Sequence, residues 1–311
     1  MALKDVKSRI ASVKNIQKIT RAMEMVAAAR LRRAEQRIES LRPYAGAIRR
    51  MTRQAAEAAG NVPNLPILNE HESEQTVAIL LVTGDRGLAG AFNSQIVRAG
   101  MRAGNEYESA GKSTVWYASG RRGVSSLAFR GREAKGAYTG FTDRPSYANA
   151  REIAAGLVSA YVDGEVDRVE IIYNRYVSAL TQEVTRETLL PLQHATIMGD
   201  DGAVDSLGER AAVADDGKLD QDHDHTALVE YEPDPEEILE RLIPAYVEIS
   251  IFRALLESTA SEHGARMTAM RSASENAGDI IKDLTLEFNR ERQAAITQEI
   301  MEVVAGAESL V

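Results

Sequence analysis

Both ends of the chain carry apolar side chains at alternating spacings of three and four residues. In residues 1–59 the two rows that result are Leu3, Ile10, Gln17, Glu24, Leu31, Ile38 and Ala45, and Val6, Val13, Thr20, Ala27, Ala34, Leu41 and Ile48. A spacing sustained over about seven heptads favours one long coiled-coil helix. Gln17 and Glu24 interrupt the first row, and buried polar side chains at such positions can set the register of a coiled coil.

A second apolar stripe runs beside these rows through Ile16, Ile19, Met23 and Val26. The small residues of 23–30 would let another helix approach closely. Two interpretations remain open at this stage. The stripe is either a second contact face for another neighbour or one edge of a wide core stripe.

The C-terminal stretch repeats the heptad pattern. Its rows are Ile249, Leu256, His263, Met270, Ala277 and Leu284, and Ala260, Met267, Ser274, Ile281, Phe288 and Ala295. His263 therefore falls on the seam, where we interpret it as a packed polar residue rather than a catalytic base. The economical arrangement of the two end helices is an antiparallel coiled coil.

The middle of the chain alternates between strand-like and helix-like runs. The expected strands are 76–83, 113–119, 168–177 and 182–192, and the expected helices are 92–110, 121–129 and 146–163. Such alternation favours an α/β layer with a largely parallel sheet. The predicted fold class is therefore α/β with long helices. An antiparallel coiled coil of N- and C-terminal helices carries an inserted Rossmann-like α/β domain.

Charge divides the chain further. Residues 1–59 hold 14 Lys or Arg against 5 Asp or Glu, a net charge of +9, whereas residues 199–240 hold 2 against 15, a net charge of −13. A basic helix suits an acidic partner, and an acidic run poor in large apolar groups suits a solvated loop. The predicted organisation is 1–59 coiled-coil helix, 60–198 Rossmann-like domain, 199–232 acidic loop insertion and 233–311 coiled-coil helix.

Several kinds of chemistry have no support in the sequence. The chain contains no cysteine, which excludes disulfides and thiol catalysis. The run DHDH at 222–225 could in principle ligate a metal, but its residues are adjacent and no other histidine cluster supports them, so no metal and no cofactor are predicted. No apolar run approaches the roughly 20 residues that span a bilayer, so no direct membrane insertion is expected.

The glycine loop TGDRGLAGAF at 83–92 follows an apolar strand and precedes an amphipathic helix, as many phosphate sites do. Its spacing is GxxGxxG rather than GxGxxG, and the chain has no GxxxxGK[ST], HExxH or GxSxG motif. We therefore interpret the loop as a tight turn. Two other functions stay open, a nucleotide-binding enzyme using this loop and a coiled-coil scaffold or basic-helix nucleic-acid binder.

Four runs of the sequence resemble one family in the same order along the chain. DVKSRIASVKNIQKITRAMEMVAAARLRRAE (5–35) and LLVTGDRGLAGAFNSQIV (80–97) come first, followed by IPAYVEISIFRALLESTASEHGARMTAM (243–270) and ITQEIMEVVAGAES (296–309). All four resemble the gamma subunit of F-type ATP synthases. The last run matches that family's signature through Thr297, Glu299, Glu302, Gly306 and Ala307.

The resemblance implies a non-catalytic central-stalk rotor of a proton-translocating ATP synthase. Its partners would be the hexamer of alpha and beta subunits, the epsilon subunit and the membrane c-subunit ring, with no nucleic acid. ATP chemistry would take place on the beta subunits. The expected location is the cytoplasmic face of a bacterial cell membrane, as a peripheral protein.

The resemblance also implies contact residues. Those expected to face the alpha/beta hexamer are Met23, Arg266, Arg292, Gln293, Thr297 and Glu299. Met23 and Arg266 would lie near an acidic lever of a beta subunit. The tip around Val303, Val304 and Leu310 would sit in an apolar bearing.

Overall fold

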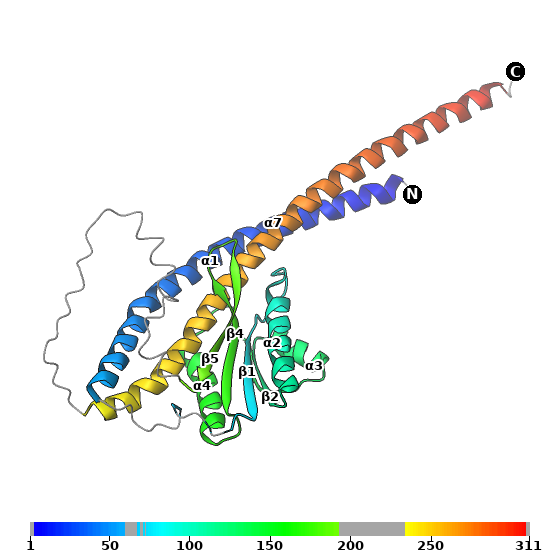
Figure 1. The fold of residues 1–311 in the computed structure, drawn as a ribbon. Coiled ribbons are helices and arrows are strands. Elements are labelled where there is room, and N and C mark those ends of the chain that lie inside the picture. The colour runs from blue at the N-terminus through cyan, green and yellow to red at the C-terminus, as the bar shows by residue number, and fades with distance from the viewer. Residues whose placement is uncertain (1–2, 60–66, 69–70, 72, 193–233, 309–311) are drawn as a thin grey trace.

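Two long helices running antiparallel dominate the structure, a computed structural model that describes residues 3–59, 67–68, 71, 73–192 and 234–308. Helix α1 (Leu3–Ala59) has 57 residues and α7 (Pro235–Glu308) has 74. At about 1.5 Å per residue these lengths correspond to roughly 85 and 110 Å. Figure 1 shows the two helices crossing, with an α/β domain beside them and the C-terminal part of α7 reaching beyond the first turn of α1.

The predicted seam between the helices is confirmed except at Ala295, the last residue of the second row of α7, which is exposed. No residue of the two predicted rows of α1 is exposed, and all six residues of the first row of α7 are buried. Both polar interruptions find a partner across the seam. Gln17 donates from Nε2 to the backbone oxygen of Ser274 at 3.3 Å, and Glu24 pairs with Arg271 at 2.9 Å. These contacts join specific turns of the two helices and so oppose a sliding of the register.

The second apolar stripe of α1 faces outward. Ile16, Ile19 and Val26 are 53, 59 and 52 % exposed, and Met23 is partly exposed. The interpretation of this stripe as the edge of a wide core is therefore wrong for this chain. An exposed apolar row of this length is typical of a contact face.

The inserted domain is the predicted, largely parallel α/β layer, and its sheet has five strands, one more than expected. Its strands are β1 (Thr76–Val82), β2 (Ser113–Ser119), β3 (Ala134–Tyr138), β4 (Arg168–Tyr176) and β5 (Gln182–Leu190). Their order is β3-β2-β1-β4-β5, and every pairing is parallel except that of β4 with β5. Strand β1 is central, and its alternate residues reach both faces. Val77 and Ile79 pack on one side, whereas Ala78 and Leu80 pack on the other.

Helices cover both faces of the sheet. Helices α2 (Phe92–Ser109) and α3 (Arg121–Phe129) cover one face, while α4 (Tyr147–Val162) and the first half of α7 cover the other. The middle of α7 is therefore enclosed by α1 on one side and by the domain on the other. Residues 254–264 of α7 are all buried. The heptad pattern alone predicts the α1 contact but does not reveal the second one.

Strand β3 was absent from the expected elements. It has only five residues, AKGAY, and its burial alternates between partly buried and exposed because it lies at the sheet edge beyond β2. A short edge strand buries too little apolar surface to leave a strong sequence signal. The acidic insertion predicted at 199–232 and the DHDH run within it lie outside the described residues. No helix of the described segments is both long and apolar enough to cross a membrane.

The seam should account for much of the shaft's stability. Leu31 is 4 % exposed in a cluster with Leu256 and Ala260, so Leu31→Ala should lower the free energy of unfolding by about 2–4 kcal/mol. Ile19→Ala, at an exposed position of the same helix, is the matched control and should change stability by less than about 0.5 kcal/mol. Denaturant unfolding followed by helical circular dichroism measures both. Equal losses in the two variants would contradict the assigned seam.

Candidate functional site

The carboxyl end of β1 is where an open parallel sheet usually binds its ligand. Here the strand order reverses, with β2 on one side of β1 and β4 on the other. The loop that follows, residues 83–91, leads into α2. In nucleotide-binding relatives of this architecture, backbone N–H groups of such a loop hold phosphate oxygens. In this chain two of these N–H groups bond internally: that of Gly84 donates to Oδ1 of Asn93 and that of Asp85 to the hydroxyl of Thr142, each at 2.8 Å.

Asp85, in the same loop, is a charged side chain held by the neighbouring loops. Its carboxylate accepts hydrogen bonds from the backbone N–H groups of Arg121, Gly140 and Thr142 at 3.0, 2.9 and 3.2 Å. The hydroxyl of Thr142 adds a fourth at 3.0 Å. Arg121 is the first residue of α3, and Gly140 and Thr142 belong to the loop after β3. The carboxylate of Asp85 therefore links the loops that follow β1, β2 and β3.

The surroundings of Asp85 keep it ionised. Burial alone would raise the pKa of its carboxyl group, but the backbone N–H donors and the Thr142 hydroxyl together outweigh burial and hold the pKa below its usual value. Arg86, the next residue along the chain, pairs instead with Asp143 at 3.6 Å. The negative charge of Asp85 at this edge of the sheet would also repel a phosphate group.

Helix α7 fills the rest of the crevice. A Cβ atom placed on Gly84 would lie 2.7 Å from the carboxyl group of Glu262, so only glycine leaves room for that side chain. Glu262 is 2 % exposed and pairs with Arg266, which is 8 % exposed. Arg266 also donates to the backbone oxygen of Gly87 at 3.2 Å. Burial raises the pKa of Glu262 although the Arg266 guanidinium opposes the rise.

Little space remains at this point. The cavity between the end of β1 and α7 is about 10 Å³, room for at most a single water molecule. A nucleotide cannot enter without displacing α7 from the sheet. The hypothesis of a nucleotide-binding enzyme that uses 83–92 therefore fails on geometry, and the loop is the structural turn that the glycine spacing indicates.

Small polar residues of α7 anchor it to the strand ends. Ser258 donates to the oxygen of Val82 at 3.3 Å, Thr259 to that of Thr142 at 2.9 Å and Ser261 to that of Asn174 at 3.1 Å. The small side chains in this stretch thus do more than permit close approach to α1. They satisfy backbone acceptors of the domain, which fixes the shaft to the domain at several points.

Glu257 is a second buried carboxylate on α7, one residue before this polar row. It is 7 % exposed, and its Oε2 has no hydrogen-bond partner in the structure. Burial raises the pKa of Glu257 to about 7, with Arg253 and Arg175 lowering it and Glu187 raising it. Arg253 itself pairs with Glu187 at 2.8 Å. Two carboxylates and two guanidinium groups thus lie close together between α7 and the sheet.

His263 is packed on the seam, as interpreted from the sequence. It is 2 % exposed, and burial together with nearby Arg266 lowers its pKa to about 4. Arg266 lies 3.3 Å from Nδ1 of His263. Since a guanidinium can only donate, Nδ1 must accept, and the neutral ring carries its proton on Nε2.

The predicted contact residues fall into three situations. Met23 is partly exposed on α1. Arg292, Gln293, Thr297 and Glu299 are all exposed on α7, where Thr297 donates to the Gln293 oxygen at 2.9 Å. Arg266 is almost buried and is engaged with Glu262 and Gly87, so its observed role is inside the chain. Whether any of the six touches a partner stays a prediction.

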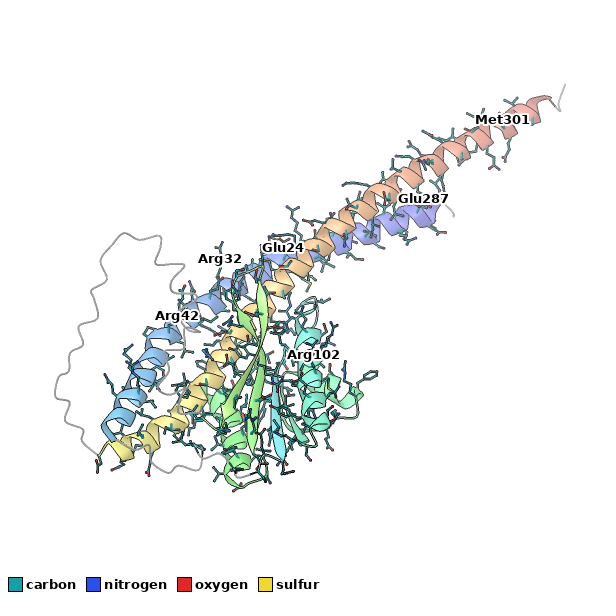
Figure 2. All side chains as sticks on the ribbon, viewed as in Figure 1. Glu24, Arg32, Arg42, Arg102, Glu287 and Met301 are labelled. Atoms are coloured by element: carbon teal, nitrogen blue, oxygen red, sulfur yellow. The ribbon has the colours of Figure 1, made fainter. Side chains whose placement is uncertain are left out.

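The C-terminal part of α7 has no described helix beside it. Figure 2 shows Met301 well beyond the N-terminal end of α1, on this free segment. Its large apolar side chains are about half exposed or more, namely Leu286, Ile296, Ile300, Met301, Val303 and Val304. Val303 and Val304 belong to the predicted apolar tip, whereas Leu310 lies outside the described residues.

Asp85, Glu262 and Glu257 are the residues that the sequence reasoning missed. Glu262 sits next to His263 in the heptad pattern, but no spacing rule indicates that it reaches a glycine 178 positions earlier in the chain. Within the described residues, no group of three or more His, Cys, Asp or Glu is arranged to hold a metal ion.

Comparison with known sequences gives one consistent result. A family model described as ATP synthase matches residues 2–310. The ATP synthase gamma chain of Heliobacterium modesticaldum is 42 % identical over 309 residues, covering 99 % of this chain and 99 % of that protein. That of Streptomyces coelicolor is 40 % identical over 314 residues, covering 99 and 96 %.

Comparison with solved structures supports the fold. A chain of the mitochondrial ATP synthase of Euglena gracilis, solved by cryo-electron microscopy with its OSCP, F1 and c-ring parts, gives a TM-score of 0.66 at 19 % identity. The match covers 99 % of this chain and 94 % of that one. A chain from the central stalk and c-ring of the Tetrahymena thermophila enzyme gives 0.57 at 24 % identity, covering 82 and 99 %.

The Glu262–Arg266 pair should behave as a buried ion pair. Arg266→Met leaves Glu262 buried without its counter-ion and should lower the free energy of unfolding by about 3–5 kcal/mol. Adding Glu262→Gln in the same chain should recover most of that loss, since no uncompensated charge then remains. A double-mutant cycle in urea tests this. Additive losses in the double variant would contradict the coupling.

Glu257 should make stability depend on pH. Its pKa is higher in the folded chain, so the folded state binds more protons than the unfolded state between about pH 4.5 and 7, and stability falls as pH rises through that range. Relative to the wild type, Glu257→Gln should therefore gain about 1 kcal/mol between pH 6 and pH 8. His263, whose lowered pKa makes stability rise with pH, contributes equally to both proteins, so its effect drops out when the variant is compared with the wild type. Urea unfolding at both pH values measures it, and a pH-independent difference would contradict the assignment.

Proposed function

The chain belongs to the gamma-chain family of F-type ATP synthases, and we propose that it turns as the central rotor shaft of such an enzyme. In this function it performs no chemistry itself. It couples rotation of a proton-driven membrane ring to conformational change at catalytic sites on the beta subunits. The observation that carries the proposal is mechanical, because the middle of one long helix, α7, is joined both to α1 and to the domain.

A shaft must transmit torque between its two ends without slipping. The two helices are held in register by the Gln17 and Glu24 contacts. The domain is held to α7 by the hydrogen bond from Arg266 to Gly87 and by the serine and threonine bonds. Each contact is small, but they act on different turns and on different strand ends. Rotation of the domain therefore carries both helices with it, as coupling requires.

The exposed surfaces suit the partners that the family implies. The free segment of α7 after Leu284 presents apolar side chains all along its length and would occupy the centre of the alpha/beta hexamer. The α/β domain would stand on the c-subunit ring together with the epsilon subunit. In this proposal the chain would lie at the cytoplasmic face of a bacterial cell membrane as a peripheral subunit.

The predicted contact residues lie at three places on the shaft, namely on α1, on the middle of α7 and on its C-terminal part. Met23 lies beside the exposed row of Ile16, Ile19 and Val26, so that face of α1 would meet a beta subunit. Arg292, Gln293, Thr297 and Glu299 are polar positions on the free part of α7 and would touch the inner wall of the hexamer. Arg266, in the middle of α7, would act mainly by fixing the loop at Gly87.

Reconstitution tests the function. Alpha and beta subunits of the same organism should show rotation-coupled ATPase activity only when this chain is added. Addition of the c-ring and the other stalk subunits should then permit proton-driven ATP synthesis. Undiminished coupling in the absence of the chain would overturn the proposal, and so would failure of the chain to co-purify with the hexamer.

Met23 offers a sharper test of how the shaft faces the hexamer. Met23→Lys adds a cation that would pair with an acidic lever of a beta subunit and must break from it at every step. Pairs at partly buried interfaces are worth ~1–3 kcal/mol, so turnover should slow about tenfold. Met25→Lys, at a 63 % exposed position two residues on and so on the other side of α1, is the control and should slow turnover much less. Equal slowing in both would contradict the placement.

A further inference from the structure

A pocket separate from the crevice lies where α1, α7 and the loop between β3 and α4 meet. Its volume is about 160 Å³, far above the roughly 10–15 Å³ that one water molecule needs. The residues around it are Arg30, Arg33, Ala34, Arg37, Asp143, Arg144, Leu256, Thr259 and His263. Arg30, Arg33 and Arg37 follow a helical spacing of three and four, so one face of α1 supplies three guanidinium groups.

The charges around this pocket do not balance. Four arginines contribute +4 and Asp143 contributes −1, while His263 is neutral because its pKa is about 4. Arg30 donates to Asp143 at 2.7 Å, and the same carboxylate lies 3.6 Å from Arg86. Asp143 is thus already shared. Across the described residues, no ion pair or side-chain hydrogen bond is formed by Arg33, Arg37 or Arg144.

Guanidinium groups gathered around one pocket without counter-ions repel one another. Arg37 is partly buried, whereas Arg33 and Arg144 are exposed. An arginine fork matches the oxygens of a phosphate group bidentately, which a point charge such as lysine does not. The buried floor adds no competing negative charge. It consists of Leu256, Thr259 and the neutral ring of His263, each at most 4 % exposed.

We propose that this pocket binds a phosphate-class oxyanion between Arg33 and Arg37 of α1 and Arg144 of the β3–α4 loop. Two sources share this chemistry, free inorganic phosphate and the phosphate chain of a nucleotide. An apolar groove of about 510 Å³ continues from the pocket past Arg37 and Leu256. Tyr44, Tyr147 and Phe252 line it, so a nucleoside attached to the bound phosphate would find aromatic surfaces there.

Binding at this place has a structural consequence. The pocket is bounded by α1 on one side and by α7 and the domain loop on the other, close to the Arg30–Asp143 bridge. An anion held by arginines from both sides adds a link between the first helix and the domain. The proposal stands on the pocket alone and does not depend on the rotor function.

Ligand-induced stabilisation of the full-length chain tests the proposal. Sodium phosphate should raise the melting temperature above that in sodium chloride of equal ionic strength, and isothermal titration should give a saturable isotherm. Titration with ADP distinguishes the two sources. Tighter binding of ADP than of phosphate assigns the groove to a nucleoside, whereas equal or weaker binding assigns the site to the free anion.

Matched variants separate the site from general ionic effects. Arg33→Gln with Arg37→Gln should weaken phosphate binding about tenfold or more, because two bidentate donors are lost. Arg98→Gln with Arg102→Gln makes the same charge change with the same four-residue spacing on α2, which covers the opposite face of the sheet, and should leave binding unchanged. Figure 2 shows Arg102 on that helix.

Arg144→Gln on the loop is a further variant that does not touch the coiled coil, and it too should weaken binding. Circular dichroism confirms that each variant retains its helices. The absence of a phosphate-specific shift in the wild-type chain would overturn the proposal. Equal weakening in the α1 and α2 double variants would overturn it as well, since it would reveal a general ionic effect.

Discussion

The enclosure of α7 between α1 and the sheet is the constraint on which the rest of this structure depends. Helix α7 is both the second helix of the coiled coil and one of the helices that cover the sheet. Residues 254–264 are therefore buried on all sides. A surface helix has one apolar stripe, whereas this stretch must satisfy two different neighbours at once. It does so with small polar side chains on the domain side and with Leu256, Ala260 and His263 on the α1 side.

The same enclosure explains why a nucleotide-type architecture holds no nucleotide at the usual place. The sheet order, the glycine loop and the helix that follows all belong to that architecture. The N–H groups of Gly84 and Asp85, however, donate to Asn93 and Thr142, and Glu262 of α7 fills the remaining space against Gly84. The loop's donors are thus used inside the chain, and internal carboxylates lie where this architecture usually binds a ligand. The place of a ligand crevice is taken by a packed contact between the domain and α7. Such a contact can transmit torque because almost no empty space remains in it.

The parts of the fold that rest on periodicity could be predicted from the sequence. The heptad rows of α1 and α7 and the alternation of strands and helices from 76 to 190 depend on spacings that a single chain displays. Strand β3 could not be found in this way, because AKGAY is short and half exposed at the sheet edge. The pairing of Glu262 with Arg266 beside Gly84 was also out of reach, since it depends on how two distant segments meet. The family resemblance supplied the function, and it placed Arg266 at a partner, whereas the structure shows its guanidinium bound inside the chain.

The central claim is that domain and shaft turn as one body. The absence of cysteine makes this directly measurable, because Arg102→Cys on the exposed face of α2 introduces a single attachment point far from the shaft. A bead attached there, on a complex whose alpha and beta subunits are fixed to glass, should rotate in one direction when ATP is supplied. Steady ATP hydrolysis with a bead that only fluctuates about one position would contradict the account, since the domain would then not follow the shaft.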